Sequence, residues 1–360
     1  MCKKMKMIET SDGSTYKQGK PIKKKKSSSK ESLKWDRAIA RGKLCWETQD
    51  CTMNPPKFDS STVRYLWTIW HVIDQESQAS YAVKAISKHL AMKLGQTENI
   101  CRERRILLGL KHPFIVRMYK TDSDMRCVYL YQDFVNGGSL TLLHKMQAEF
   151  KDEIIQFYAA QIALALDYIH SKGIIYLNVK MDNVMIGKDG YLKLIDFHKA
   201  KKLYKIGKTN TTIGNPTYTA PEILEGKIYD SSPDWWAFGI LLYELHYGSP
   251  PFAGSDPFEV LKSIQKDEAK FSDENSDLDH LLSRLLRKDP KNRCKGQKVL
   301  QHMFFNNLDF KSLLAKKKEP PFFPNVKSES YTRNFKKVEA DLPMIEYPMV
   351  DFVKRKIQFW

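Results

Sequence analysis

The pattern of apolar residues along the chain changes after about the first third. Residues 58–88 are rich in β-branched and aromatic side chains, which favour strands. A helix is predicted at 98–110, where apolar residues recur at helical spacing. The predicted strands cover 63–69 and 80–86, surround Met118, and cover 127–134. These patterns predict a small, mostly β region with one helix.

Beyond Asn136-Gly137-Gly138 the spacing becomes helical. Residues 153–170 carry apolar side chains every three or four positions, and the pattern stops at Gly173, a typical helix end. Residues 234–247 are nearly all apolar, which predicts a helix buried on all sides, and 278–286 form another helix. The second region is therefore predicted to be larger and mostly helical.

The remaining segments predict extensions on both sides of this core. A helix with Trp35 and Trp46 is expected at 34–48, and the basic, proline- and aromatic-rich residues after 305 are expected to wrap the surface. The predicted divisions are a disordered basic arm at 1–34, a helix and linker at 35–57, a small lobe at 58–135, a large lobe at 136–305 and a tail at 306–360.

Charge and cysteine content add a few constraints. The formal net charge is +17, and residues 1–34 hold eleven lysines against Glu9, Asp12 and Glu31. Such an arm can contact nucleic acid, acidic lipid or an import receptor, but a solvated tail without a dedicated partner explains it more simply. The six cysteines lack paired spacing, and no apolar run reaches membrane-spanning length. A cytoplasmic protein is expected, with the nucleus as an additional location and no specific nucleic-acid partner.

Four polar residues stand out in short motifs that mix polar and apolar positions. Asn183 and Asp196 are thirteen residues apart, in two short loops that follow apolar runs. An amide and a carboxylate supply the oxygen ligands that Mg²⁺ prefers. Lys84 is the last residue of the motif Tyr81-Ala82-Val83-Lys84 within the predicted strand 80–86, and Glu103 follows nineteen residues later on the predicted helix.

Further motifs follow in the same order as in one known family. Ala220-Pro221-Glu222 precedes the apolar helix that starts at Asp234, and Arg293 is expected to pair with Glu222. From about residue 40 to 345 the chain resembles the cAMP-dependent, or AGC, protein kinases. The resemblance also rests on His112-Pro113-Phe114-Ile115-Val116 and on the tail motif Pro321-Phe322-Phe323-Pro324. It implies an α+β, bilobal protein-kinase fold with a small β-rich lobe and a larger helical lobe.

The resemblance also implies roles for individual residues. Lys84 and Glu103 would hold the α- and β-phosphates of ATP, and Asn183 and Asp196 would bind Mg²⁺. Thr211 occupies the regulatory phosphorylation position. The adenine ring would be contacted by Ile69, Ala82, Met185 and Val135, with Gln132 as gatekeeper, and Leu107, Met118, Tyr176 and Phe197 would stack between the lobes.

Several positions depart from the family pattern at the expected site. Asn178 stands where the catalytic base should be, and an amide cannot accept the substrate proton. Leu177 replaces the arginine that would meet a phosphate on Thr211. No glycine occurs between Phe58 and Lys84, so the backbone cannot approach phosphates closely there. His198 replaces the third residue of the metal-binding motif, and Asn215 replaces a bracing threonine.

Some positions that would bind a substrate or a regulatory subunit differ from the family pattern. Asp182 and Glu244 keep the acidic character expected for recognition of basic substrates, whereas a third such position is Ser139. Asn210 replaces a tryptophan that packs on regulatory subunits in the family, which argues against that partnership. The positions that form an apolar pocket in the family are occupied here by Thr212, Pro216 and Thr219.

Two functions remain open from the sequence. The first is a pseudokinase, an ATP-binding scaffold or allosteric partner in signalling that binds ATP and Mg²⁺ weakly and transfers little or no phosphate. The second is an active Ser/Thr kinase for basic protein substrates, in which Lys180 or the substrate itself compensates for Asn178. Both imply protein partners.

Overall fold

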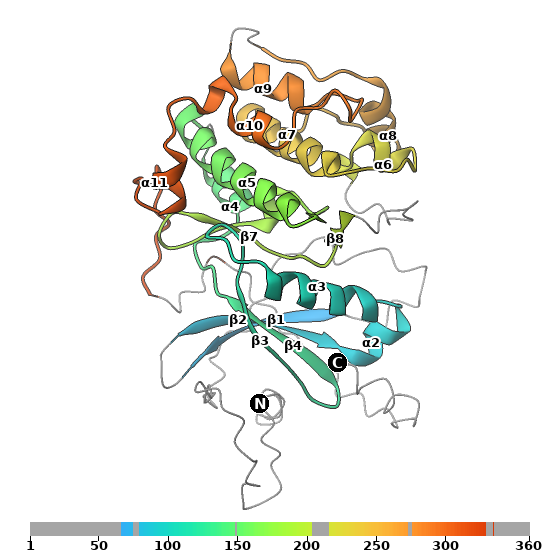
Figure 1. The fold of residues 1–360 in the computed structure, drawn as a ribbon, viewed down its shortest axis with the longest axis vertical. Coiled ribbons are helices and arrows are strands. Elements are labelled where there is room, and N and C mark those ends of the chain that lie inside the picture. The colour runs from blue at the N-terminus through green and yellow to red at the C-terminus, as the bar shows by residue number, and fades with distance from the viewer. Residues whose placement is uncertain are drawn as a thin grey trace, which may run out of the picture. The chain divides into compact units, whose positions relative to one another are not determined.

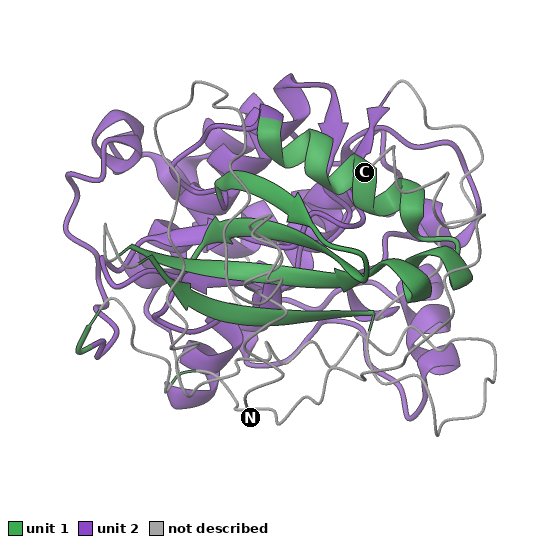
Figure 2. Ribbon diagram, turned by 90° about the horizontal axis from the view of Figure 1, so that it is seen from below, with its two compact units in different colours: residues 1–108, 117–134, 327–360 green, residues 109–116, 135–326 purple. Residues whose placement is uncertain are grey.

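The computed structural model describes residues 66–74, 79–147, 150–203, 216–272, 276–328 and Asn334. The predicted helix at 34–48, the basic arm and most of the tail lie outside these residues. The chain divides into two compact units, coloured separately in Figure 2. Unit 1 comprises 1–108, 117–134 and 327–360, and unit 2 comprises 109–116 and 135–326.

Unit 1 is built on a four-stranded antiparallel sheet with strand order β1-β2-β4-β3 (Figure 1). The elements of this unit are β1 (Trp67–Ile73), β2 (Ser80–Ser87), α2 (Lys88–Lys93), α3 (Thr97–Gly109), β3 (Met118–Ser123) and β4 (Cys127–Asp133). The predicted strands and the helix near 98–110 are confirmed within the described residues. The expectation of a single helix in this region was wrong, because α2 precedes α3.

The start of α2 has a local cause that the apolar pattern does not reveal. Ser87 is the last residue of β2, and its side-chain oxygen accepts a hydrogen bond from the backbone N–H of Leu90 at 3.3 Å. A serine in this position satisfies one of the free N–H groups of a first helical turn. The chain therefore passes directly from β2 into a six-residue helix.

The two faces of the sheet differ in chemistry. Strand residues alternate between the faces, and cross-strand partners share a face. One face carries a buried, largely aromatic cluster of Trp70, Val72, Val83, Ala85, Cys127, Tyr129 and Tyr131. The opposite face carries Lys84 and its register partners Ile69 and Leu130. We call this the Lys84 face; by alternation it also includes Trp67, Ala82 and Gln132.

Unit 2 is mostly helical, as predicted. Its helices are α4 (Leu140–Met146), α5 (Asp152–Ser171), α6 (Pro221–Leu224), α7 (Ser232–Tyr247), α8 (Pro257–Lys266), α9 (Asp277–Leu285), α10 (Gln297–Leu300) and α11 (Phe310–Leu314). Its short strands are β5 (Ile174–Ile175), β6 (Val184–Ile186), β7 (Leu192–Leu194) and β8 (Lys201–Lys202). The strands pair as β5-β8 and β6-β7.

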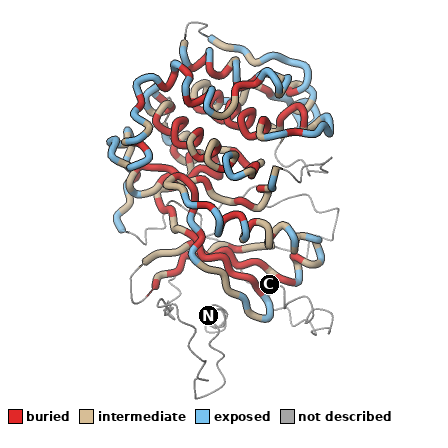
Figure 3. The backbone as a smooth tube through the Cα atoms, in the orientation of Figure 1, coloured by how far each residue is buried: buried red, intermediate tan, exposed pale blue. Residues whose placement is uncertain are grey.

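The core of unit 2 lies around α5 and α7, whose inner residues are buried (Figure 3). Helix α7 is buried along almost its whole length, which confirms the expectation from its apolar sequence. It begins at Ser232, two residues before the predicted start, because Pro233 is compatible with a first helical turn. Gly239 is required here, because a Cβ atom at this position would lie 2.9 Å from the Leu285 side chain of α9.

Residues 306–326 of the tail belong to unit 2. Lys316 pairs with Asp189 at 2.6 Å, and the Tyr191 hydroxyl donates to the Lys318 carbonyl oxygen. Among the described helices, none combines the length and hydropathy that a bilayer-spanning segment needs.

Candidate active site

Lys84 and Glu103 form the ion pair that the sequence predicted. The Nζ atom of Lys84 donates to both carboxylate oxygens of Glu103, at 2.9 and 3.0 Å. The two side chains are only 5% and 1% exposed. Glu103 lies on the buried side of α3 together with Ile100, Ile106 and Leu107. The helical spacing of these residues therefore places the carboxylate against the Lys84 face of the sheet.

A third group contacts the same ammonium. The ring of Trp67 lies over Lys84 Nζ, with 4.5 Å between the nitrogen and the ring centroid. Trp67 is the first residue of β1. Its register partner is Ile86, which lies two residues after Lys84 on β2. A cation over an indole face is attracted by the electrons of the ring, and the attraction grows when water is excluded. Lys84 is thus enclosed by Glu103 on one side and by an aromatic ring on another.

The predicted adenine contacts of unit 1 are neighbours of this pair. Ala82 is the register partner of both His71 and Gln132 in the sheet, and Gln132 is also the partner of Met118. Gln132 is 9% exposed, and its Nε2 atom is buried without a hydrogen-bond partner among the described residues. Ile69 is half-buried. The structure therefore brings Ile69, Ala82 and Gln132 onto the Lys84 face.

Unit 2 holds the predicted catalytic loop through one buried carboxylate. Asp234 accepts hydrogen bonds from the backbone N–H groups of Tyr176 and Leu177, at 2.8 and 2.7 Å. Its Oδ2 atom also lies 2.8 Å from Nε2 of His170. Leu177 has a φ of 58°, in the left-handed region that β-carbon-bearing residues rarely adopt. The hydrogen bonds to Asp234 hold the backbone in this strained conformation.

Asn178, at the position of the catalytic base, contacts the predicted metal ligand. Its Nδ2 atom donates to the backbone oxygen of Asp196 at 2.9 Å and to the carboxylate Oδ2 at 3.2 Å. Asn183 in turn donates from Nδ2 to the Asn178 carbonyl oxygen at 2.9 Å. The backbone N–H of Ile195 donates to the Asn183 carbonyl oxygen at 3.0 Å. Hydrogen bonds therefore connect Asn178, Asn183 and Asp196 directly.

The second oxygen of the Asp196 carboxylate has its own contact. Nδ1 of His198 lies 2.8 Å from Asp196 Oδ1. Asp196 has a φ of 57°, so a second residue with a β-carbon adopts the left-handed region in this site. Both oxygens of the carboxylate are thus engaged by side chains of the chain itself. The sequence had placed the His198 ring beside the metal position, and the structure puts it in contact with the metal ligand.

The donor set fits Mg²⁺ in kind. Mg²⁺ is commonly held by one or two protein oxygens together with water and phosphate oxygens. Asn183 and Asp196 offer an amide oxygen and a carboxylate, and Mg²⁺ would neutralise phosphate charge there. Among the described residues, no group of three or more His, Cys, Asp or Glu side chains is arranged to hold a metal ion. A metal at this place would therefore depend on the nucleotide for most of its ligands.

The remaining predicted site residues of unit 2 are Lys180, Met185 and Val135. Lys180 immediately precedes the short 3₁₀ turn Met181–Asn183, and its Nζ lies 4.0 Å from Asp182. Met185 is buried in β6, and Val135 is buried shortly after β4. Between them, Gly137 donates its N–H to the Ile186 oxygen at 2.8 Å. A Cβ atom on Gly137 would lie 2.4 Å from that oxygen, so only glycine permits this approach.

The four residues expected to stack are divided between the units. Leu107 and Met118 are buried in unit 1, at 1% and 5% exposure. In unit 2, the rings of Tyr176 and Phe197 lie 4.7 Å apart between centroids. The Tyr176 hydroxyl donates to the backbone oxygen of Ile195. Tyr176 and Phe197 are therefore in ring contact within unit 2, with their planes tilted by 49°.

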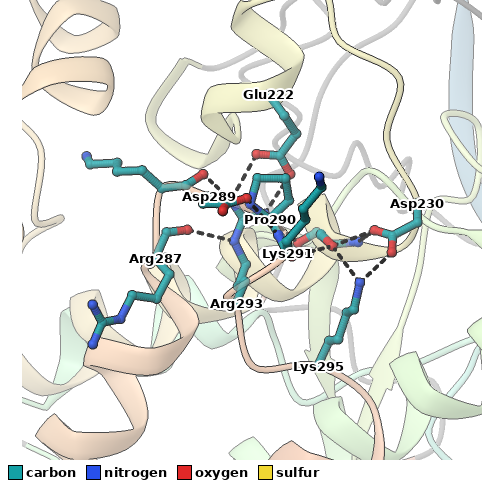
Figure 4. Close-up of polar contacts among 10 residues, drawn as sticks. Glu222, Asp230, Arg287, Asp289, Pro290, Lys291, Arg293 and Lys295 are labelled. Atoms are coloured by element: carbon teal, nitrogen blue, oxygen red, sulfur yellow. Dashed lines mark hydrogen bonds and ion pairs between the residues drawn. The ribbon is translucent and has the colours of Figure 1, made fainter.

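The predicted pair of Glu222 and Arg293 is also confirmed (Figure 4). Arg293 donates to the two oxygens of Glu222 at 2.6 and 2.9 Å. Its other three donors meet backbone oxygens of Arg287, Ser232 and Lys288. All five guanidinium N–H groups therefore have acceptors, which is how a fully buried arginine is accommodated.

The predicted substrate-reading positions are only partly described. Asp182 accepts a hydrogen bond from the Thr141 hydroxyl at 2.7 Å. Burial raises the pKa of Glu244, and the nearby charge of Asp182 acts in the same direction, while the Tyr218 hydroxyl donates to Glu244 and lowers it. Ser139 accepts from the N–H of Leu142 as the N-cap of α4. The positions that lie outside the described residues are Asn210, Thr211, Thr212 and Asn215.

Two features of the site escaped the sequence interpretation. Asn178 was recognised as unable to act as a base, but its role as a donor to Asp196 was not foreseen. An amide can donate where a carboxylate cannot, so the substitution itself carried that information. The left-handed backbone of Leu177 was also missed, since no local motif marks it.

Comparisons with known proteins agree with the geometry. The profile of the protein kinase domain family matches residues 68–305. The chain is 38% identical over 252 residues to cAMP-dependent protein kinase type 3 of Saccharomyces cerevisiae, covering 68% of this chain and 63% of the relative. It is 36% identical over 274 residues to a cAMP-dependent protein kinase, catalytic subunit-like, of Caenorhabditis elegans, covering 74% and 68%.

A third relative comes from a neighbouring group of kinases. The RAC family serine/threonine-protein kinase homolog of Dictyostelium discoideum is 35% identical over 265 residues, which cover 72% of this chain and 60% of that protein. The matched region thus spans less than two thirds of the yeast and Dictyostelium relatives. From its family match, its relatives and the paired motifs of both units, the chain belongs to the protein kinase domain family, with relatives of the cAMP-dependent and wider AGC type.

Proposed function

We propose that this chain is a pseudokinase of the cAMP-dependent kinase type. It binds ATP and Mg²⁺ weakly, transfers little or no phosphate, and acts as a scaffold or allosteric partner for other signalling proteins. The family gives the general expectation of ATP and Mg²⁺ use. The departures at the site give the reason to expect loss of transfer.

The contact between Asn178 and Asp196 carries the proposal. A general base must accept the proton of the attacking hydroxyl, and the Asn178 amide has instead turned its donor toward Asp196. Loss of a general base usually costs about 10²–10⁴ in rate. Phosphoryl transfer depends mainly on positioning and electrostatic stabilisation, so this loss alone need not abolish the reaction.

A second contact supports the proposal independently. The Lys84 ammonium, which would meet the phosphates, lies under the Trp67 ring. A phosphate oxygen that replaced the ring contact would have to displace a large side chain. Impaired proton transfer and impaired phosphate binding therefore act on separate steps, and their effects should add.

An active Ser/Thr kinase is the second candidate, and two observations favour it. The Lys84–Glu103 pair is intact and buried. The side-chain amide of Asn183 donates a hydrogen bond to the carbonyl oxygen of Asn178. Lys180 lies two residues from Asn178 and could stabilise a transferring phosphoryl group. A proton could then leave with help from the substrate phosphate.

Radiolabelled phosphate transfer from Mg-ATP to a basic serine peptide separates the two. We expect the full chain to be slower than an intact relative by at least about 10²-fold. Asn178→Asp should recover only part of that loss. Asp196→Asn, as the control, should remove whatever transfer belongs to this chain. A rate within tenfold of the intact relative, abolished by Asp196→Asn, would establish the active kinase instead.

A further inference from the structure

The side-chain amide of Gln132 is buried on the Lys84 face of the sheet. Its Nε2 atom has no hydrogen-bond partner among the described residues, although the side chain is more than nine-tenths buried. Its register partners in the sheet are Ala82 and Met118, both apolar. A buried donor without an acceptor is costly, because the group has lost its hydrogen bonds to water. Gln132 is therefore well suited to a ligand that brings an acceptor.

The cation on the same face of the sheet is in the opposite situation. Lysine has three N–H donors and no acceptor. Two donors of Lys84 meet the oxygens of Glu103, and the Trp67 ring covers the nitrogen at 4.5 Å. The charge of Lys84 is thus matched by a carboxylate and an aromatic face. Phosphate would gain little here unless Trp67 moved.

The charged group that would bind the metal is engaged in a similar way. In unit 2, Asn178 donates to Asp196 Oδ2, and His198 Nδ1 lies against Asp196 Oδ1. A metal ion would have to compete with both contacts for the carboxylate. In each unit, therefore, the group that a kinase would direct toward Mg-triphosphate contacts the chain's own side chains.

From this contrast we infer that the site takes an uncharged purine nucleoside, with adenosine as the probe, about as well as it takes Mg-ATP. The heterocycle supplies the acceptor for Gln132, and the triphosphate and metal add little affinity because Trp67 covers Lys84. Trp67 is thus a specificity-determining residue that sets the preference for nucleoside over nucleotide. This inference rests on the proposed nucleotide-binding function and narrows its ligand class.

Titration calorimetry on the full chain with adenosine, ATP and Mg-ATP tests the inference. For the unmodified protein we expect dissociation constants that agree within about threefold for all three ligands. Trp67→Leu removes the ring and should tighten Mg-ATP by about tenfold, equivalent to about 1.4 kcal/mol, while adenosine changes little. Trp67→Phe retains an aromatic face and is the matched control, expected to behave like the unmodified chain.

Gln132→Met provides an independent arm, because methionine has similar length and no donor. It should weaken adenosine and ATP by the same factor, of about tenfold. Unfolding by urea checks that both the Trp67 and Gln132 variants fold. Mg-ATP binding more than tenfold tighter than adenosine in the unmodified chain would overturn the inference, as would the absence of binding by all three ligands or a Trp67→Leu variant that weakens Mg-ATP.

The outcome is separable from that of the proposed function. Equal binding of adenosine and Mg-ATP together with rapid phosphate transfer would refute the pseudokinase proposal and leave the ligand inference standing. Slow transfer together with strongly preferred Mg-ATP would do the reverse.

Discussion

The side-chain amide of Asn178 donates to both the backbone oxygen and the carboxylate of Asp196, at 2.9 and 3.2 Å. A residue at the position of a catalytic base has thereby become a hydrogen-bond donor to the predicted metal ligand. This contact stabilises the loop without any metal ion. It also changes what restoring the family residue should do.

Asn178→Asp should therefore destabilise the protein in the absence of metal. The substitution replaces an N–H donor with a second carboxylate next to Asp196, and like charges at this distance repel. We expect a loss of about 1–3 kcal/mol at pH 7, the usual cost of removing a buried hydrogen-bond partner. Mg²⁺ should restore much of it, as measured by thermal unfolding with and without the ion.

The control for this experiment is Asn178→Ala. It removes the donor without adding charge, so its stability should not respond to Mg²⁺ more than that of the unmodified chain. If Asn178→Asp proves as stable as the parent without metal, the donor role assigned to Asn178 is incorrect.

Two neighbouring ion pairs of unit 2 should differ sharply in strength. Glu222→Gln leaves the buried Arg293 guanidinium, 0% exposed, without its countercharge. Breaking a buried pair in this way costs about 3–5 kcal/mol. Lys295→Ala breaks the pair with Asp230, whose side chains are 36% and 55% exposed, and should cost less than about 1 kcal/mol. Urea unfolding of the two variants makes the comparison, and similar losses would contradict the assignment.

Acid should destabilise unit 1 through His71. Burial lowers the pKa of His71 to about 4 from 6.5. The unfolded chain therefore binds a proton more readily than the folded chain, and stability present above pH 6.5 is lost as the pH falls toward 4. The contribution is at most about 3 kcal/mol, since each pH unit between 6.5 and about 4 changes the free energy of unfolding by about 1.4 kcal/mol.

His71→Phe is the variant that checks this, because a phenyl ring can keep the stacking on Phe134, now 4.2 Å between centroids. Urea unfolding at pH 7, 5.5 and 4.5 should show a smaller loss of stability for His71→Phe than for the parent. Parallel pH profiles for the two proteins would show that His71 is not the group responsible.

Phosphorylation of Thr211 should have little effect in this chain. Leu177 offers neither charge nor donor, so the added phosphate would gain no more than surface charge pairs, worth about 0–1 kcal/mol. Leu177→Arg should create a partner for it through charge-assisted hydrogen bonds. Melting temperatures of Thr211→Glu, alone and combined with Leu177→Arg, test this. If Thr211→Glu alone, with Leu177 retained, raised the melting temperature by several degrees, another basic residue would be the partner of the added charge.

Much of the architecture could be predicted because it depends on residue spacing. The residue pattern placed Lys84 on a strand and Glu103 on a helix, the family resemblance implied that they pair, and the pair forms as expected. The family resemblance also implied the pair of Glu222 and Arg293, which lie seventy-one residues apart and form the expected ion pair. The apolar sequence of α7 predicted its complete burial. Helix α2 was missed because its start depends on a single cap, Ser87, and not on a periodic pattern.

The contacts that bear on activity could not be derived in this way. Motif order alone identified Lys84, Asn183 and Asp196 as polar groups of one site, and the substitution of Asn178 was visible in the letters. Which atoms these groups contact depends on side chains that are distant in sequence and brought together only by folding. Eighteen residues separate Asn178 from Asp196, and seventeen separate Trp67 from Lys84. The sequence by itself determined the family and the location of the altered positions, whereas the tertiary structure decided that Asn178 donates to Asp196 and that Trp67 covers Lys84, because hydrogen bonds and cation–ring contacts depend on distance and direction in space.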